Sequence, residues 1–291
     1  MTRQASVVAL SLLMLGCAES ADDPVAAAMP STTAAEASSA SPAEPDAYYE
    51  YLWCRQGENY SAESGAKLVA DWNAVIDGLD AQPRAAFAYL PDGWEDPNFD
   101  GLWVLNWEDA EAMAAGWAAF AAADGDERVN GQNPGVLSCG AEPGVDRFGW
   151  TSYVPKDIPV SFNIDAPPYY LTNQLCTYKE GKSGADLRAV VRDHFLPAVL
   201  SIAESNPDSS YWFRVEAPDF TPLEAYPTDF NWVNFWKDRD EGLASQAAFA
   251  ESAAGAEIQT MLNEVASCAP AEPQGWAGYA LRTADGAVAA R

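Results

Sequence analysis

The spacing of hydrophobic residues predicts a strand followed by a helix at the start of the globular part of the chain. Residues 48–56 are rich in aromatic side chains, which favours a strand. In residues 64–79 the apolar positions are spaced by four, three and four, as on one face of a helix. These positions are Leu68, Trp72, Val75 and Leu79. Ser64 is the predicted N-cap, because serine accepts hydrogen bonds from the first helical turn.

Residues 80–154 predict two strands, a second helix and a closing strand. Residues 84–90 and 101–107 have strand-like composition, and the segment between them is rich in turn-forming residues. Residues 108–123 are rich in alanine and begin with acidic residues, which favours a helix. Residues 146–154 predict the last strand. The predicted order is therefore β-α-β-β-α-β.

The same order occurs a second time, because the chain contains an internal repeat. A shift of 129 residues superposes Trp103, Trp107, Asp109 and Cys139 on Trp232, Trp236, Asp238 and Cys268. With slightly different shifts, Cys54 corresponds to Cys176 and Trp150 to Trp276. Three tryptophan pairs and two cysteine pairs in one order make chance similarity a poor explanation. The elements predicted for the second copy are strand 169–178, helix 185–204, strands 210–215 and 231–236, helix 238–265 and strand 274–282.

Each copy has the element order of a split βαβ, or ferredoxin-like, unit. Two such units in one chain resemble the dimeric α/β-barrel superfamily, whose antibiotic-biosynthesis-monooxygenase-like members pair two ferredoxin-like sheets face to face. The resemblance lies in element order and repeat layout, with no diagnostic motif. It implies an α+β fold in which repeats 47–156 and 169–291, joined by a linker at 157–168, form an intramolecular pseudo-dimer. Two independent domains lying side by side are the alternative.

The N-terminal residues predict export and a lipid anchor. Residues 1–16 contain a basic start and an apolar stretch that is too short to span a bilayer. With Gly16 followed by Cys17, this segment resembles a bacterial lipoprotein signal peptide, which implies cleavage before Cys17 and acylation of that residue. An ordinary secretory peptide with a chance cysteine is the alternative. By the same resemblance, Ala18 after the cysteine implies the outer membrane of a Gram-negative bacterium.

A tether is predicted between the anchor and the globular part. Residues 17–46 begin with the lipidated cysteine. They consist largely of alanine, serine, proline and acidic residues, with no aromatic residue and no base. Such a segment cannot bury enough apolar area to offset the loss of chain entropy. An amphipathic helix is the alternative, and four prolines within the segment argue against it.

The charge of the chain excludes some partners. The sequence has 43 acidic and 16 basic residues, a formal charge of −27. Residues 47–291 keep 37 acidic and 15 basic residues, a charge of −22. Nucleic acid is excluded as a partner, because phosphate binding needs clustered lysine and arginine. We expect membrane contact only through the N-terminal lipid, and no cofactor. A single histidine excludes a multi-histidine metal site, and we expect no metal.

The four remaining cysteines are interpreted as structural crosslinks. Each repeat holds two of them, in a chain predicted to reach an oxidising compartment. Four cysteines allow three pairings, and the repeat selects Cys54–Cys139 and Cys176–Cys268, since each copy then closes an equivalent link. A zinc site is disfavoured because the chain has no CxxC motif. A catalytic thiol is disfavoured because the cysteines are duplicated in equivalent contexts.

The two Trp-Val-x-x-Trp-x-Asp segments are the most specific local motif, and they supply a candidate cavity. Residues two apart in a strand share a face. If that face lines a barrel interior, it forms an aromatic cavity for a small apolar or planar ligand. The candidate cavity residues are Trp103, Trp107, Trp232, Asn234 and Trp236. We favour the alternative, in which the rings are core residues under the helices. Asp109 and Asp238 are interpreted as helix caps.

Other candidate sites are weaker. His194 is a candidate general base, but the first repeat has no equivalent, and we favour an exposed helix residue. It is also the only conventional axial ligand for a haem in the sequence. Haem binding is therefore the least favoured of the functions considered. Asp124, Asp126 and Asn130 have calcium-loop character, but Arg128 occupies a ligand position and the terminal glutamate is missing. A calcium site is therefore disfavoured.

Two functions from different classes remain. We favour an envelope-anchored lipoprotein that acts as a non-catalytic binding module for a small molecule or a partner protein. The superfamily resemblance implies the alternative, a cofactor-independent monooxygenase. No motif in the sequence matches a monooxygenase active site residue by residue. The sequence therefore assigns no catalytic residue.

Overall fold

The structure is a computed structural model that describes residues 44–288, apart from the side chains of residues 271 and 272. The predicted signal peptide, Cys17 and nearly all of the predicted tether lie outside the described residues. The described residues belong to one compact unit. Within the described part of the chain, no helix has the length and apolar character needed to cross a membrane.

The first repeat is a four-stranded antiparallel sheet with helices on one face. In chain order its elements are β1 (Ala47–Gln56), α1 (Ala62–Ile76), β2 (Ala85–Pro91), β3 (Gly101–Trp107), α2 (Ala110–Ala122), α3 (Gly125–Val129), β4 (Leu137–Cys139) and β5 (Arg147–Tyr153). The sheet order is β2-β3-β1-β5, and the short β4 pairs with the end of β1. This is the ferredoxin-like order that the sequence predicts.

The second repeat has the same plan. Its elements are β6 (Tyr169–Tyr178), α4 (Gly184–Val190), the π-helical turn η1 (Val191–Phe195), α5 (Leu196–Ser205), β7 (Trp212–Pro218), β8 (Phe230–Trp236), α6 (Arg239–Glu251), α7 (Ala253–Val265), β9 (Ala266–Thr283) and β10 (Gly286–Ala287). The sheet order is β7-β8-β6-β9. The predicted helix 238–265 is interrupted at Ser252, whose extended backbone ends α6 and whose side chain caps α7.

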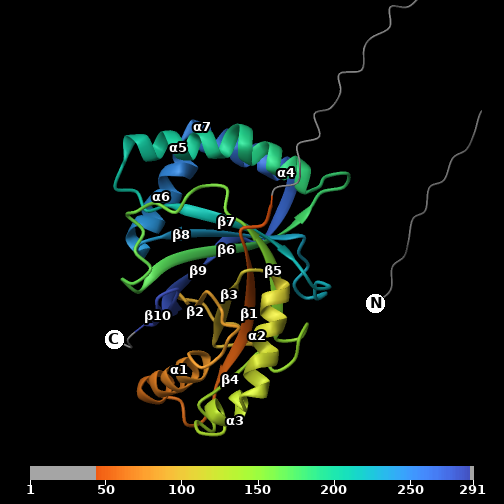
Figure 1. Ribbon diagram of the computed structural model, residues 1–291. Helices are drawn as coiled ribbons and strands as arrows, with labels where there is room; N and C mark the ends of the chain where they lie inside the picture. The colour runs from red at the N-terminus through yellow and green to blue at the C-terminus, as the bar shows by residue number, and fades with distance from the viewer. Residues whose placement is uncertain (1–43, 289–291) are drawn as a thin grey trace, which may run out of the picture. The chain divides into compact units, whose positions relative to one another are not determined.

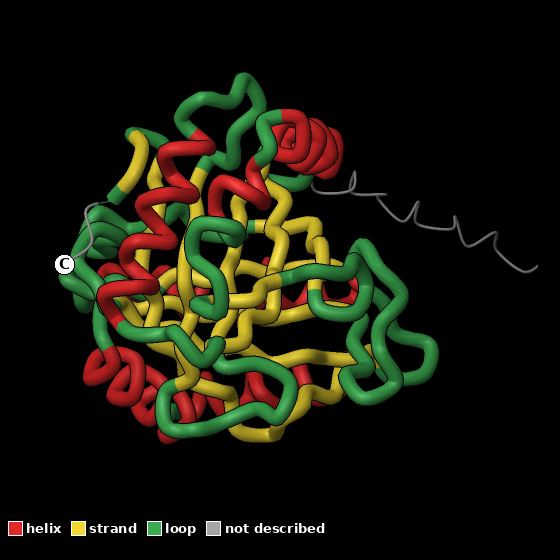
Figure 2. The backbone as a smooth tube through the Cα atoms, turned by 90° about the horizontal axis from the view of Figure 1, so that it is seen from below, coloured by secondary structure: helices red, strands yellow, loops and turns green. Residues whose placement is uncertain are grey.

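The two sheets join edge to edge into one closed barrel. Strand β5 pairs with β7, where Ser152 lies opposite Glu216, and β9 pairs with β2, where Gly278 lies opposite Tyr89. These two seams close a ring of eight strands. Figure 1 shows the helices of the two repeats on opposite outer sides of the strands, and Figure 2 shows the strands from below. The intramolecular pseudo-dimer is confirmed, and the side-by-side arrangement is wrong.

Local side chains explain where the helices begin. Asp109 and Asp238 cap α2 and α6 by accepting hydrogen bonds from the backbone three residues on, as predicted. The predicted cap of α1 is wrong by three residues, because Ser61 is the N-cap and Ser64 is its capping-box partner. The Ser64 hydroxyl, within the first helical turn, accepts the return hydrogen bond of the box from the Ser61 backbone N–H at 2.8 Å.

Three apolar clusters stabilise the barrel, one inside it and one under each helical layer. Every residue of β3 is buried, because its alternate side chains face the barrel interior and the helices. Val104 belongs to the interior cluster, whereas Trp103 and Trp107 pack on the helical side of the first repeat. Both faces of this strand are therefore apolar core.

Two disulfides crosslink the strands in equivalent places. Cys54–Cys139 joins β1 to β4, and Cys176–Cys268 joins β6 to β9. Both predicted pairings are confirmed. Disulfides persist in oxidising compartments, so these bonds are consistent with an extracytoplasmic location.

Candidate functional site

One end of the barrel is covered by two loops, one from each repeat. The loop between β2 and β3 and the loop between β7 and β8 lie at this end, where β1, β2, β6 and β7 finish. The loops are bonded to one another: Asn98 Nδ2 donates to the Tyr226 hydroxyl at 2.8 Å, and that hydroxyl donates to Asp96 Oδ2 at 3.3 Å. Both repeats therefore contribute to the entrance of the barrel.

Below these loops lies a pocket of about 380 Å³, which we call the barrel-end pocket. Its volume falls within the range of roughly 300–1,000 Å³ that is usual for small-molecule sites. The rings that line it are Tyr51, Trp53, Tyr89, Phe99, Phe148, Trp150, Phe220, Tyr226 and Trp276. Its polar lining residues are Asp96, Asn173, Thr228, Asn231 and Gln274. Among the side chains that the structure describes, Asp96 is the only aspartate, glutamate, lysine, arginine or histidine in the lining.

The rings around the pocket stand at different angles to one another. Trp53 meets Tyr226 edge-on, with centroids 5.6 Å apart and ring planes at 77°. Trp53 is also tilted against Phe99, with centroids 5.3 Å apart. Trp276 lies nearly parallel to Phe99 at 5.9 Å, and Trp94 supports it from outside the pocket at 4.6 Å. Edge-to-face packing fixes the orientation of these rings, so the aromatic walls are rigid.

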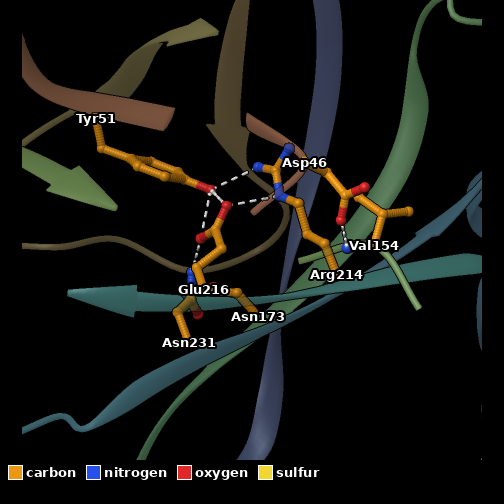
Figure 3. A network of polar contacts seen from close by, with 7 residues as sticks. All are labelled: Asp46, Tyr51, Val154, Asn173, Arg214, Glu216 and Asn231. Carbon is orange, nitrogen blue, oxygen red and sulfur yellow. Dashed lines mark hydrogen bonds and ion pairs between the residues drawn. The ribbon is translucent and has the colours of Figure 1, made fainter. Parts of the chain in front are cut away.

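A buried polar network lies beneath the pocket (Figure 3). Arg214 Nε lies 2.6 Å from Glu216 Oε1, and both side chains are almost completely buried. The Tyr51 hydroxyl donates to both carboxylate oxygens at 3.0 Å and accepts from Arg214 Nη2 at 2.6 Å. Asn231 Nδ2 donates to Glu216 Oε2 at 2.8 Å. The Glu216 carboxylate therefore has one charged partner, Arg214, and two neutral donors, Tyr51 and Asn231.

The network continues to the pocket wall through two amides. Asn173 Nδ2 donates to Asn231 Oδ1 at 3.3 Å, and Trp276 Nε1 donates to Asn173 Oδ1 at 2.7 Å. The chain of contacts thus runs from Glu216 to a tryptophan that lines the pocket. Tyr51, Asn173 and Asn231 are the members of this network that line the pocket. They form its polar floor.

Burial sets the ionisation of the network. Desolvation raises the pKa of Glu216, and the neighbouring Arg214 guanidinium opposes this shift. Burial alone would lower the pKa of Arg214, but the charge of Glu216 raises it well above its ordinary value. Arg214 is therefore a permanent cation whose charge is offset by Glu216. Its guanidinium also stacks 3.6 Å from the centroid of the Tyr49 ring, a favourable cation–π contact.

The other end of the barrel is filled by the linker between the repeats. Phe162, in the predicted linker 157–168, is buried against Tyr169 and Trp212, with ring centroids 5.5 Å apart in both pairs. Ser161 Oγ donates to the Ser209 carbonyl at 2.7 Å and fixes this segment. The linker therefore acts as a plug, opposite the barrel-end pocket.

The candidate cavity predicted from the tryptophan motif is not in the barrel interior. Trp103 and Trp107 belong to the core under the helices of the first repeat, and Trp232 belongs to the corresponding core of the second. Trp236 packs against Tyr170 and Tyr211, and Asn234 Oδ1 accepts from Tyr211 and Trp232. The rings are core residues, which is the alternative favoured from sequence, and none of the five lines the barrel-end pocket.

One of these tryptophans borders a second, external groove. This groove, of about 420 Å³, lies against α1 and strands β2, β3 and β9, and Trp103 contributes to its wall. Small residues, including Gly65, Ala66 and Ala88, leave the space open. It is separate from the ring-lined interior of the barrel.

The remaining candidates are placed away from the pocket. His194 is exposed on the π-helical turn η1. Asp126 and Arg128 lie in the short helix α3, and Asp124 precedes it. Within residues 44–288, no group of three or more histidine, cysteine, aspartate or glutamate side chains is arranged to hold a metal. Among the residues whose side chains the structure describes, histidine, cysteine and methionine are absent from the lining of the barrel-end pocket.

The sequence contains a signal for the buried network that the repeat comparison does not use. Arg214 and Glu216 are two apart within an apolar strand, so their side chains share a face. Two opposite charges on one face of such a strand indicate a buried ion pair. The pocket residues of the two loops carry no comparable pattern.

Comparisons with known proteins bear on the fold alone. No protein-family model and no curated protein matches the sequence. The structure is similar to the chlorite dismutase of Candidatus Nitrospira defluvii in complex with imidazole, at 12% identity, 81% coverage of this chain, 92% of that chain and a TM-score of 0.46. An anthrone oxidase-like protein is 10% identical over 81% of this chain and 94% of its own, with a TM-score of 0.47. These values carry no conclusion about activity, and the strand pairing itself establishes the barrel.

Proposed function

We propose that this protein is an extracytoplasmic lipoprotein that binds a small molecule in the barrel-end pocket without transforming it. The observation that supports this proposal is the pocket itself, which combines nine aromatic rings with a few convergent polar groups. Ligand sites typically have this composition. The pocket also lies at the loop-covered end of the barrel, where a molecule can enter between elements of both repeats.

The proposed location rests on the sequence and the disulfides. The Gly16-Cys17 signal favours lipid attachment, and the two disulfides favour an oxidising compartment. We propose that the lipid holds the protein at the outer membrane of a Gram-negative bacterium. Labelling cells with a radioactive fatty acid tests the anchor, because Cys17→Ser abolishes incorporation if the proposal holds.

A fluorescent probe tests the pocket. N-phenyl-1-naphthylamine is apolar and planar, and its emission rises when it leaves water. We expect saturable binding by the purified protein with intact disulfides. Ala225→Trp adds a large ring at the pocket lining and should abolish binding. Ala247→Trp, the matched control, is on the exposed face of α6 and should leave it unchanged.

The same two variants separate binding from the alternative function. We expect no oxygen consumption when the protein is mixed with an electron-rich phenol such as 2-naphthol. Oxygen uptake that Ala225→Trp abolishes and Ala247→Trp retains would support a cofactor-independent monooxygenase instead. Equal probe binding by both variants would contradict the pocket as the ligand site.

A further inference from the structure

We infer that the ligand of the barrel-end pocket is a small organic cation with a methylated ammonium group. This inference rests on the proposed function, since it takes the pocket as the ligand site and names the chemistry that the pocket selects. Three features of the pocket support it: the arrangement of its rings, the sign of its charge, and the amide oxygens of Asn173 and Asn231 in its floor, which already accept hydrogen bonds from the protein.

The rings supply favourable electrostatics for a cation. The face of an aromatic ring is electron-rich, and a cation placed over several such faces is stabilised, most strongly by tryptophan. Trp53, Phe99 and Tyr226 meet at large angles rather than in one stack. Trp276 packs nearly parallel to Phe99, with ring centroids 5.9 Å apart. The lining therefore holds rings in several orientations, so a cation in the pocket can lie against more than one ring.

The charge near the pocket is negative. Asp96 is the only formally charged side chain among the described residues of the lining, and its Oδ2 accepts from the Tyr226 hydroxyl at the entrance. The nearest buried cation, Arg214, is paired with Glu216 below the floor and is not part of the lining. The surrounding repeats carry a formal charge of −22, which raises the local concentration of cations. Within the described lining, an anionic ligand would meet an aspartate and no base.

The apolar walls select a methylated ammonium rather than a bare one. A primary ammonium has three N–H donors, and burying them without acceptors is costly. A trimethylammonium group has no donor, so ring faces can replace its water. A metal ion is a poor alternative, because the part of the lining that the structure describes offers one carboxylate and hard cations need several oxygen ligands.

Choline and its neutral isostere 3,3-dimethylbutan-1-ol test the inference, because they have the same shape and differ by one charge. In isothermal titration of the purified protein, we expect choline to bind at least about tenfold more tightly than the isostere. Benzyltrimethylammonium, which adds a ring, should displace N-phenyl-1-naphthylamine from the pocket. Equal affinities for choline and the isostere would overturn the inference.

Two variants test whether Trp53 and Asp96 cause the preference for choline over its neutral isostere. Trp53→Leu keeps an apolar wall but removes a ring face, and it should reduce the preference for choline over the isostere at least about threefold. Asp96→Asn should reduce the same ratio, more strongly at low than at high salt. Asp80→Asn, an exposed aspartate in the loop between α1 and β2, is the matched control and should leave the ratio unchanged. An unchanged ratio in both pocket variants would contradict the cage.

The outcomes distinguish this inference from the proposed function. If the neutral probe binds and neither choline nor benzyltrimethylammonium displaces it, the cation inference fails while the pocket remains the binding site. If neither the neutral probe nor the cations bind, the proposed function fails and the inference fails with it.

Discussion

The guanidinium of Arg214 lies 2.6 Å from the carboxylate of Glu216, inside a closed barrel where the two side chains are 1% and 0% exposed. Both residues come from one strand, β7, whose pairing with β5 forms one of the two seams between the repeats. Tyr51 from the first repeat and Asn231 from the second complete the network. The contacts of Tyr51 with Glu216 and Arg214 therefore join the two repeats at the centre of the barrel.

Breaking this ion pair on one side should be strongly destabilising. Glu216→Gln leaves the buried Arg214 cation without its counter-charge, which we expect to lower the free energy of unfolding by about 3–5 kcal/mol. The double variant Arg214→Met, Glu216→Leu removes both charges and should recover much of that loss. Urea unfolding followed by circular dichroism measures all three proteins. A loss below about 1 kcal/mol for Glu216→Gln would contradict an unscreened buried pair.

Each disulfide should contribute separately to stability. The linked cysteines are 85 and 92 residues apart, and closing loops of this length stabilises a protein by about 4 kcal/mol in the chain-entropy model. We expect Cys54→Ser, Cys139→Ser and Cys176→Ser, Cys268→Ser to lower the free energy of unfolding by similar amounts. Denaturant unfolding of the two double variants measures this. A large loss in one repeat and none in the other would contradict equivalent crosslinks.

Gly116 in helix α2 should resist a substitution that normally stabilises helices. Alanine usually favours a helix over glycine by about 1 kcal/mol. A Cβ at Gly116, however, would lie 2.3 Å from the Trp107 ring, so Gly116→Ala should instead destabilise the protein by about 1–3 kcal/mol. Thermal unfolding gives the sign. In a Trp107→Leu background the same substitution should cost less, and an identical cost in both backgrounds would contradict the contact.

Glu50 should make stability fall as pH rises. Its carboxylate is buried and accepts from Trp117 Nε1 at 2.8 and 3.0 Å, with Arg147 Nε 3.6 Å away. Desolvation raises the pKa of Glu50 above its ordinary 4.5 despite these partners. Between the pKa of the unfolded state and that of the folded state, the folded protein keeps a proton that the unfolded chain has lost. The stabilising contribution of Glu50 is therefore complete below pH 4.5 and is lost as the pH rises through the pKa of the folded state.

Glu50→Gln removes this titration but keeps an acceptor for Trp117. We expect the free energy of unfolding of the variant, relative to the natural protein, to increase as pH rises from about 4 to about 8. Chemical denaturation at each pH measures the difference. Glu58→Gln, at an exposed position, should show no such trend. A constant difference for Glu50→Gln across this range would contradict the raised pKa.

The repeat made much of the fold predictable. Tryptophans and cysteines recur in one order, and that order identifies both ferredoxin-like units and the two disulfides. The breaks within helices were less predictable. Residues 238–265 have continuous helical composition, but the Ser252 hydroxyl accepts from the Gly255 backbone at 2.9 Å. A local side-chain cap there ends one helix and begins another.

The site was harder to predict because both faces of the central strands are apolar. In β3 the alternation of Trp103 and Val104 separates two faces, but both are buried, so hydrophobicity does not identify the interior. Closure of the barrel determines which face of the strand lies in the interior. Asp96 and Tyr226 come from loops 130 residues apart, and only the docking of the two repeats brings them together.

A crystal structure of the protein with benzyltrimethylammonium would locate the ligand. We expect density in the barrel-end pocket, with the ammonium group among Trp53, Phe99 and Tyr226 on the side of Asp96. Density only in the external groove beside Trp103, or a barrel interior filled by the protein's own side chains, would contradict this expectation.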